Sequence, residues 1–256
     1  IVPRSMLVDR ARAAVDGQRQ LILAGAVEAV DVEAILTDAV NGALATLRPS
    51  LRRVINATGV IIHTNLGRSV LAEPAVQAVV EAARGYSTLE YSIENMARGS
   101  RHDHVEHLIC ALTGAEAAIA VNNNAAAVMM VLAEFAAGHE AIVSRGELVE
   151  IGGSFRVPDI MAQSNARMVE VGATNKTHAS DYERAISPDT AMLLKVHPSN
   201  YRMIGFTESV SKTDLRHIAD AENARRAAAG EGRPELLVYE DQGSGAFMHL
   251  DVFGEY

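Results

Sequence analysis

The chain has no tryptophan, a single cysteine and, among its 256 residues, few lysines. Aromatic residues make up only 4% of the sequence, so a hydrophobic core has to be built from alanine, valine, leucine, isoleucine and methionine. The lone Cys110 excludes a disulfide within the chain and is typical of a reducing compartment, so we expect a cytoplasmic protein.

Long apolar runs and an excess of positive charge are also missing. No apolar run is long enough to span a membrane, and the first residues have no apolar core of a secretory signal. The net charge of −9 argues against indiscriminate binding to nucleic acids. With 48% hydrophobic residues, the chain can form one sizeable core and at most a small appendage.

Helix-like and strand-like segments alternate through most of the sequence. Residues 7–47 show helical spacing that Gly25 interrupts, and residues 54–68 are typical of an extended crossing segment. Beyond them we expect helices at 74–83, 100–112, 125–137, 147–155, 181–186 and 212–229, and strands at 117–122, 141–144, 167–172, 191–196 and 235–241. Ser100 and Asp103 form a possible capping box for one of these helices. The alternation predicts an α/β fold with a mostly parallel sheet.

A run of asparagines stands between an expected strand and an expected helix. Free N–H groups and the positive end of the dipole at such a helix start can hold a phosphate. Asn123, Asn124 and Ala125 are therefore candidate phosphate ligands. Asparagines also cap helices that bind no ligand, and the local sequence leaves both interpretations open.

The run that ends at Asp241 is typical of a buried strand that delivers a carboxylate to the turn Gly243-Ser244-Gly245. Parallel sheets bind ligands beyond the carboxyl ends of their strands, so this acid and the asparagine run should share one edge. A phosphate site together with an acid for a ring nitrogen suits pyridoxal phosphate. An aspartate that ends a strand is also common without any ligand.

Nine segments, in order, resemble the bacterial selenocysteine synthases, which are L-seryl-tRNA(Sec) selenium transferases. They are Arg53–Gly59, His63–Arg68, Thr88–Tyr91, Asn122–Val128, Ser144–Gly153, Gly172–His178, Ser199–Tyr201, Gly205–Thr207 and Asp241–Gly245. The resemblance implies an aspartate-aminotransferase-like (fold type I) large domain at residues 50–256, with pyridoxal 5′-phosphate as cofactor. Residues 1–49 would then be a helical remnant of an N-terminal domain.

The resemblance also implies a reaction and an assembly. Seryl-tRNA(Sec) would be converted to selenocysteinyl-tRNA(Sec) with selenophosphate, through an aminoacrylyl intermediate, with the cofactor as electron sink. The family forms rings of dimers with active sites at the dimer interfaces, so we expect a homo-oligomer and no membrane partner.

Several residues acquire roles through the resemblance. The asparagine run would hold the cofactor phosphate, and Asp241 would pair with the pyridine nitrogen. Glu147, which follows Arg145 at a strand end, would face the cofactor ring, although an acid at a helix start is an equally good interpretation. Arg68 would contact selenophosphate or a substrate phosphate, unless it is a solvated arginine. The remaining candidates for cofactor contacts are Asn200 and Ser244.

The chain has no lysine at the position where the resemblance implies a Schiff-base lysine. The family's Schiff-base lysine follows the Asp-x-Gly-Ser-Gly segment in a Ser-Gly-Asp-Lys context, and Lys176, Lys195 and Lys212 all lie elsewhere. We therefore expect a fragment that is inactive on its own. Two alternatives remain: a pyridoxal-phosphate lyase or transferase acting on a free amino acid, and a non-catalytic scaffold subunit.

Two charged clusters invite other interpretations. The residues from His102 to His107 include three histidines and two acids but lack a recognisable metal-ligand pattern, so we expect no metal site. Arg98 and Arg101 flank a glycine at an expected helix start, where a cation opposes the helix dipole. This placement suggests an anionic partner for the two arginines, but a solvent-exposed surface role is the better interpretation of each taken alone.

Overall fold

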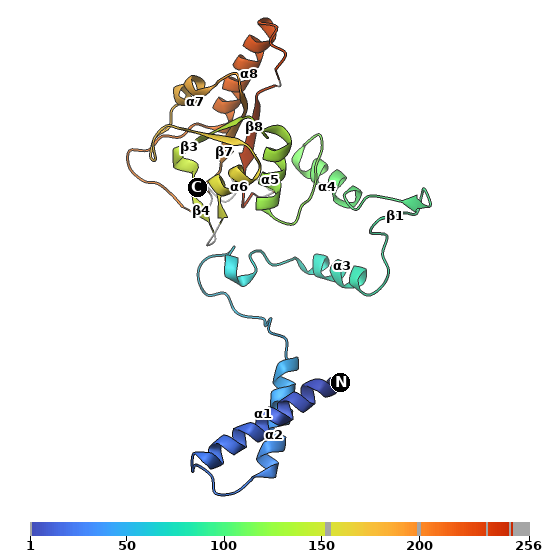
Figure 1. Cartoon of the computed structure of the whole chain (residues 1–256). Coiled ribbons are helices and arrows are strands. Elements are labelled where there is room, and N and C mark those ends of the chain that lie inside the picture. The colour runs from blue at the N-terminus through green and yellow to red at the C-terminus, as the bar shows by residue number, and fades with distance from the viewer. Residues whose placement is uncertain (1, 152–154, 199–200, 234, 246, 248–256) are drawn as a thin grey trace. The chain divides into compact units, whose positions relative to one another are not determined.

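In the computed structural model the chain forms two compact units, residues 1–70 and 71–256, which are described separately (Figure 1). The structure describes residues 2–151, 155–198, 201–233, 235–245 and 247. Within these ranges no helix is both long and apolar enough to cross a membrane. The domain boundary expected after residue 49 stays a prediction.

The first unit is a helical hairpin followed by an extended segment. Helices α1 (Arg4–Leu23) and α2 (Val32–Leu47) pack on each other. Gly25 lies in the connection just after the end of α1, where its backbone has a left-handed φ of 70°. Asp31 caps α2 by accepting a hydrogen bond from the Ala34 amide at 2.9 Å. The extended segment contains only the short 3₁₀ helix η1 (Thr64–Leu66). The predictions of a helical region broken at Gly25 and of a crossing segment are confirmed.

The second unit begins with α3 (Glu73–Ala83), a hairpin of β1 (Tyr91–Ser92) and β2 (Ala97–Arg98), and α4 (Asp103–Thr113). The capping box predicted from Ser100 and Asp103 is wrong, because α4 begins after His102 without a side-chain cap. Ser100 instead accepts a hydrogen bond from the His102 amide at 3.2 Å. The anion beside Arg98 and Arg101 is Glu90, whose carboxylate pairs with both guanidinium groups.

The core of the second unit is a four-stranded parallel sheet with the strand order β6-β3-β7-β8. The strands are β3 (Glu140–Ser144), β6 (Arg167–Val171), β7 (Thr190–Val196) and β8 (Leu237–Asp241). The alternating helices α5 (Asn124–Phe135), α6 (Val157–Gln163), α7 (Ala179–Ala185) and α8 (Lys212–Ala228) flank it. The predicted α/β fold with a parallel sheet is confirmed.

Side chains that alternate along the strands build two apolar layers, one on each face of the sheet. Val143 and Leu194 pack under α5 and α6 on one face. Ile142 and Leu193, which are paired across β3 and β7, pack under α7 and α8 on the other. Among the described residues, Tyr182 is the one aromatic side chain in the buried core. The prediction of an aliphatic core is therefore confirmed.

Two expected elements are wrong. Residues 117–122 form no strand, and the chain reaches α5 as irregular backbone. The described residues of 147–155 form no α-helix either, and residues 152–154 lie outside the described part of the chain: the 3₁₀ helix η2 (Arg145–Glu147) is followed by short strands β4 (Glu150–Ile151) and β5 (Phe155–Arg156). The helix α6 starts only at Val157, with Pro158 in its first turn, where a missing amide proton costs no hydrogen bond.

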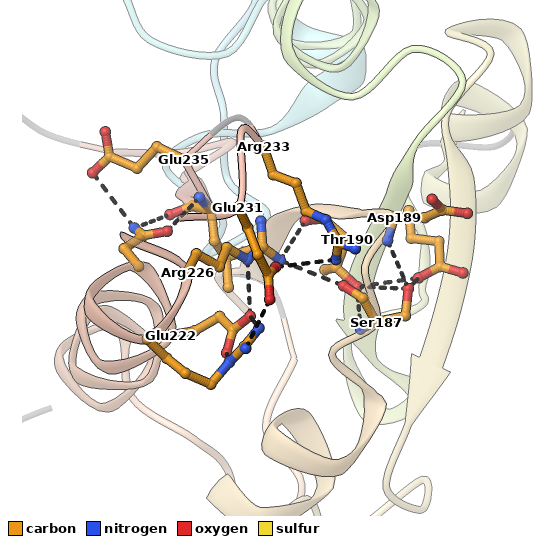
Figure 2. Close-up of polar contacts among 12 residues, drawn as sticks. Ser187, Asp189, Thr190, Glu222, Arg226, Glu231, Arg233 and Glu235 are labelled. Carbon is orange, nitrogen blue, oxygen red and sulfur yellow. Dashed lines mark hydrogen bonds and ion pairs between the residues drawn. The ribbon is translucent and has the colours of Figure 1, made fainter. Parts of the chain in front are cut away.

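A buried arginine fastens α8 to the beginning of β7. Arg226 is 3% exposed, and its guanidinium donates to Glu222 at 2.8 Å and to the Thr190 carbonyl at 3.0 Å. A longer bond of 3.4 Å reaches the Ser187 carbonyl in the turn before the strand (Figure 2). These bonds lie at the amino end of the sheet and therefore leave its carboxyl edge free for a site.

Candidate functional site

The carboxyl edge of the sheet brings together two residues that are far apart in the sequence. Asn124, the first residue of α5, donates from Nδ2 to Oδ1 of Asp241 at 2.9 Å. A Cβ placed on Gly243, in the turn after β8, would lie 3.4 Å from the same Asn124 nitrogen. The expected phosphate segment and the expected ring-nitrogen acid are therefore direct neighbours.

The start of α5 combines a cap with free backbone donors. Asn123 caps the helix by accepting a hydrogen bond from the Ala126 amide at 2.8 Å. Within the described ranges the amides of Asn124 and Ala125 meet no acceptor, as expected for the first turn of a helix. Capping by Asn123 is thus confirmed, and it leaves two amides available to an anion. The phosphate role of the three residues stays a prediction.

Asp241 is a buried acid at the end of β8. It is 4% exposed, and burial raises the pKa of its carboxyl while the Asn124 hydrogen bond acts in the opposite direction. A cationic N–H group beside this carboxylate would compensate for the lost hydration. A buried acid next to open helix amides fits a phosphorylated ligand with a protonated ring nitrogen, so the residues present are compatible with pyridoxal phosphate.

Glu147 reaches the end of the neighbouring strand. Its side chain is 7% exposed, forms an ion pair with Lys195 and accepts a hydrogen bond from the Val196 amide at 2.8 Å. Burial raises the pKa of Glu147, and the contacts with Lys195 and Val196 lower it again. The carboxylate is therefore engaged with β7, and its role at the cofactor ring stays a prediction.

The η2 turn that carries Glu147 is held from two further directions. Arg145 donates to Glu170 at 3.0 Å and to the Gly172 carbonyl at 2.6 Å, which joins the turn to the end of β6. The Tyr201 hydroxyl donates to the Gly146 carbonyl at 2.9 Å. Together with the contacts of Glu147, these hydrogen bonds hold the η2 turn close to the carboxyl ends of β3 and β7.

The three remaining candidates are Arg68, Ser244 and Asn200. Arg68 is exposed and belongs to the unit of residues 1–70, where its amide donates to the His63 carbonyl at 3.1 Å. Ser244 is exposed in the turn after β8. Asn200 lies outside the described residues. The roles of all three stay predictions.

The ion pair of Lys195 with Glu147 was not predicted from the sequence. The signal was present, because a lysine inside the apolar run of β7 and an acid beside a buried strand both require a counter-charge. Within the described ranges no three His, Cys, Asp or Glu side chains are grouped so as to hold a metal ion.

Comparison with known proteins gives the family of the chain. Residues 54–255 match the family model described as L-seryl-tRNA selenium transferase. The chain belongs to this family. It is 52% identical over 256 residues to the L-seryl-tRNA(Sec) selenium transferase of Desulfomicrobium baculatum, covering 99% of this chain and 52% of that relative. The corresponding protein of Maridesulfovibrio salexigens is 54% identical over 210 residues, covering 82% of this chain and 43% of the relative.

The chain thus spans about half the length of the curated selenium transferases that it matches. Among solved structures it is similar to D-glucosaminate-6-phosphate ammonia-lyase, with a TM-score of 0.52 and 23% identity, covering 68% of this chain and 45% of that one. The family and the shared architecture confirm the expected fold class, the large domain of fold type I pyridoxal-phosphate transferases.

Proposed function

We propose that the α/β unit is the cofactor-binding part of a selenium transferase that converts seryl-tRNA(Sec) to selenocysteinyl-tRNA(Sec). The hydrogen bond between Asn124 and Asp241 carries the proposal, because it joins a helix start suited to a phosphate with a buried acid suited to a cationic ring nitrogen. The family of the chain and the names of its relatives support the reaction.

Pyridoxal 5′-phosphate is the proposed cofactor. The amides of Asn124 and Ala125 and the dipole of α5 bind the phosphate, with Ser244 as a further proposed contact. Asp241 holds a proton on the ring nitrogen, which keeps the ring electron-withdrawing. When bound, the cofactor supplies the electron sink for removal of a proton from the serine α-carbon. Glu147 and Asn200 complete the proposed set of cofactor contacts.

The same proposal covers the selenium donor, the oligomeric assembly of the protein and the division of the chain into two domains. Selenophosphate supplies the selenium after the serine hydroxyl has left, and Arg68 is its proposed contact. The whole protein acts in the cytoplasm as a ring of dimers, with residues 1–49 as part of an N-terminal domain and residues 50–256 as the large domain.

Turnover is proposed for the whole protein and not for this chain alone. The relatives are about twice as long as the aligned residues. The lysines of this chain also lie outside the sequence context in which the family places its Schiff-base lysine. We therefore expect this chain to bind the cofactor without converting seryl-tRNA(Sec).

A chimera tests the proposal directly. The aligned part of the Desulfomicrobium baculatum relative is replaced by this chain, and conversion of seryl-tRNA(Sec) is followed with radioactive selenophosphate. The chimera should form selenocysteinyl-tRNA(Sec), and Asp241→Ala should abolish the conversion. The matched control is Glu240→Ala, because Glu240 lies on the other face of β8, where it pairs with Lys212. A folded chimera that binds the cofactor but transfers no selenium would contradict the proposal.

A further inference from the structure

Two opposite charges lie largely shielded from solvent at the end of β7, where Lys195 shares with Leu193 the face of the sheet covered by α7 and α8. The side chains of Glu147 and Lys195 are 7% and 12% exposed, and they form an ion pair. The Oε1 atom of Glu147 accepts from Lys195 Nζ, and its Oε2 atom accepts from the Val196 amide at 2.8 Å. One carboxylate therefore binds two consecutive residues of the strand.

This carboxylate links the η2 turn to the strand ends of the proposed site. Val196, which donates to Glu147, is paired in register with Asp241 on β8. The next amide along, that of His197, donates to the Asp241 carbonyl at 2.9 Å. The position of the turn relative to Asp241 is thus set through β7, with Glu147 as the connecting side chain.

We propose that Glu147 and Lys195 are a positioning pair that fastens the η2 turn to the end of β7 and withholds the Lys195 amine from carbonyl compounds. The inference rests on the proposed function for the location of the cofactor site. It assigns to Lys195 a role in holding the site and excludes it as a point of covalent attachment for the cofactor.

The chemical reason lies in the lone pair of the amine. An amine attacks an aldehyde through the lone pair of its nitrogen, so the nitrogen has to be accessible. The Lys195 side chain is 12% exposed, and its nitrogen is bound to the Glu147 carboxylate. Removing the charge of Glu147 should therefore release the amine from this contact and make it available for reaction.

Reductive methylation tests the inference without any cofactor. The amine attacks formaldehyde, a C–N bond forms, oxygen leaves as water, and hydride from cyanoborohydride reduces the resulting C=N bond. The only lysines are Lys176, Lys195 and Lys212, so peptide mass spectrometry reports on each of them. Lys212 is the matched control, because it is paired with Glu240 at 3.0 Å but its side chain is 61% exposed.

In the native protein Lys195 should react at least about tenfold more slowly than Lys212. Glu147→Gln should raise the rate at Lys195 by about tenfold or more and leave Lys212 unchanged. Glu147→Asp, which keeps the charge, should restore part of the protection. Glu240→Gln, the corresponding change in the ion pair of Lys212, should leave Lys195 protected.

Two results would overturn the inference. The first is equal reactivity of Lys195 and Lys212 in the native protein, a comparison that needs no variant and holds even if Glu147→Gln fails to fold. The second is continued protection of Lys195 in a Glu147→Gln protein whose near-ultraviolet tyrosine signal is native. Failure to bind pyridoxal phosphate while Lys195 stays protected would count against the proposed function and leave the positioning pair standing.

Discussion

Replacing Arg226 by methionine should destabilise the α/β unit, because the change leaves buried acceptors without their donor. The guanidinium of Arg226 binds Glu222 at 2.8 Å and the carbonyls of Thr190 and Ser187 at 3.0 Å and 3.4 Å (Figure 2). Removing one partner of a buried ion pair costs about 3–5 kcal/mol. Since Arg225 also binds Glu222, at 2.7 Å and 2.8 Å, the acid keeps a counter-charge. We therefore expect a loss at the lower end, about 3 kcal/mol.

Urea unfolding followed by near-ultraviolet circular dichroism measures this loss. The chain has no tryptophan, so the signal comes from tyrosines such as Tyr182, which is 1% exposed in the core. With a urea dependence of about 2–3 kcal/mol per molar, the midpoint should fall by roughly 1–1.5 M. The control is Arg225→Met, which removes an arginine with the same acidic partner but a side chain that is 55% exposed. The reasoning is refuted if Arg226→Met shifts the midpoint no further than Arg225→Met does.

Three further changes test other parts of the structure. Gly172→Ala should cost about 1–2 kcal/mol for its left-handed backbone, plus about 1–3 kcal/mol because a Cβ would lie 2.2 Å from Thr177 Oγ1. Gly230→Ala, with a similar φ but open space, should show only the first cost in the same urea assay. Asn123→Ala should lower the unfolding free energy by about 1 kcal/mol through the lost cap, and Asn123→Ser should restore most of it. Burial raises the pKa of Asp241, so its stabilising contribution is full below the ordinary carboxyl pKa and is lost as pH rises through the raised value. Asp241→Asn should therefore lose less thermal stability than the native protein between about pH 4 and about pH 7, and equal losses in both would contradict this assignment.

The pairing of Asn124 with Asp241 shows what the sequence could predict. Both residues lie where a strand or a helix begins or ends, and the edge at which parallel strands end is the same for the whole sheet. Their proximity therefore followed from element order and topology, without knowledge of any side-chain contact. The hydrogen bond between them confirms that reasoning.

The region after β3 shows where local patterns fail. A helix was expected at 147–155, but η2 ends at Glu147, whose carboxylate is bound by Lys195 and Val196, far along the chain. A contact between residues so distant in sequence has no local signature. Pro158, which is common in the first turn of a helix, did carry the information that α6 starts later.

Capping patterns show the same limit. Ser100 and Asp103 have the spacing of a capping box and do not form one, whereas Ser211 and Asp214 have that spacing and do. The spacing permits the two reciprocal hydrogen bonds, but the backbone entering the helix decides whether they form. In α8 the entering residue is extended, and in α4 it is already helical.

Titration of the protein with pyridoxal phosphate, followed by the absorbance of the cofactor, is the most direct test of the central claim. The account predicts saturable binding that Asp241→Ala weakens at least about tenfold, since a charge-assisted hydrogen bond contributes about 1.5–3 kcal/mol. Glu240→Ala, one residue away on the opposite face of β8, should bind as the native protein does. Absence of saturable binding, or equal weakening by both changes, would contradict the placement of a cofactor site at this edge.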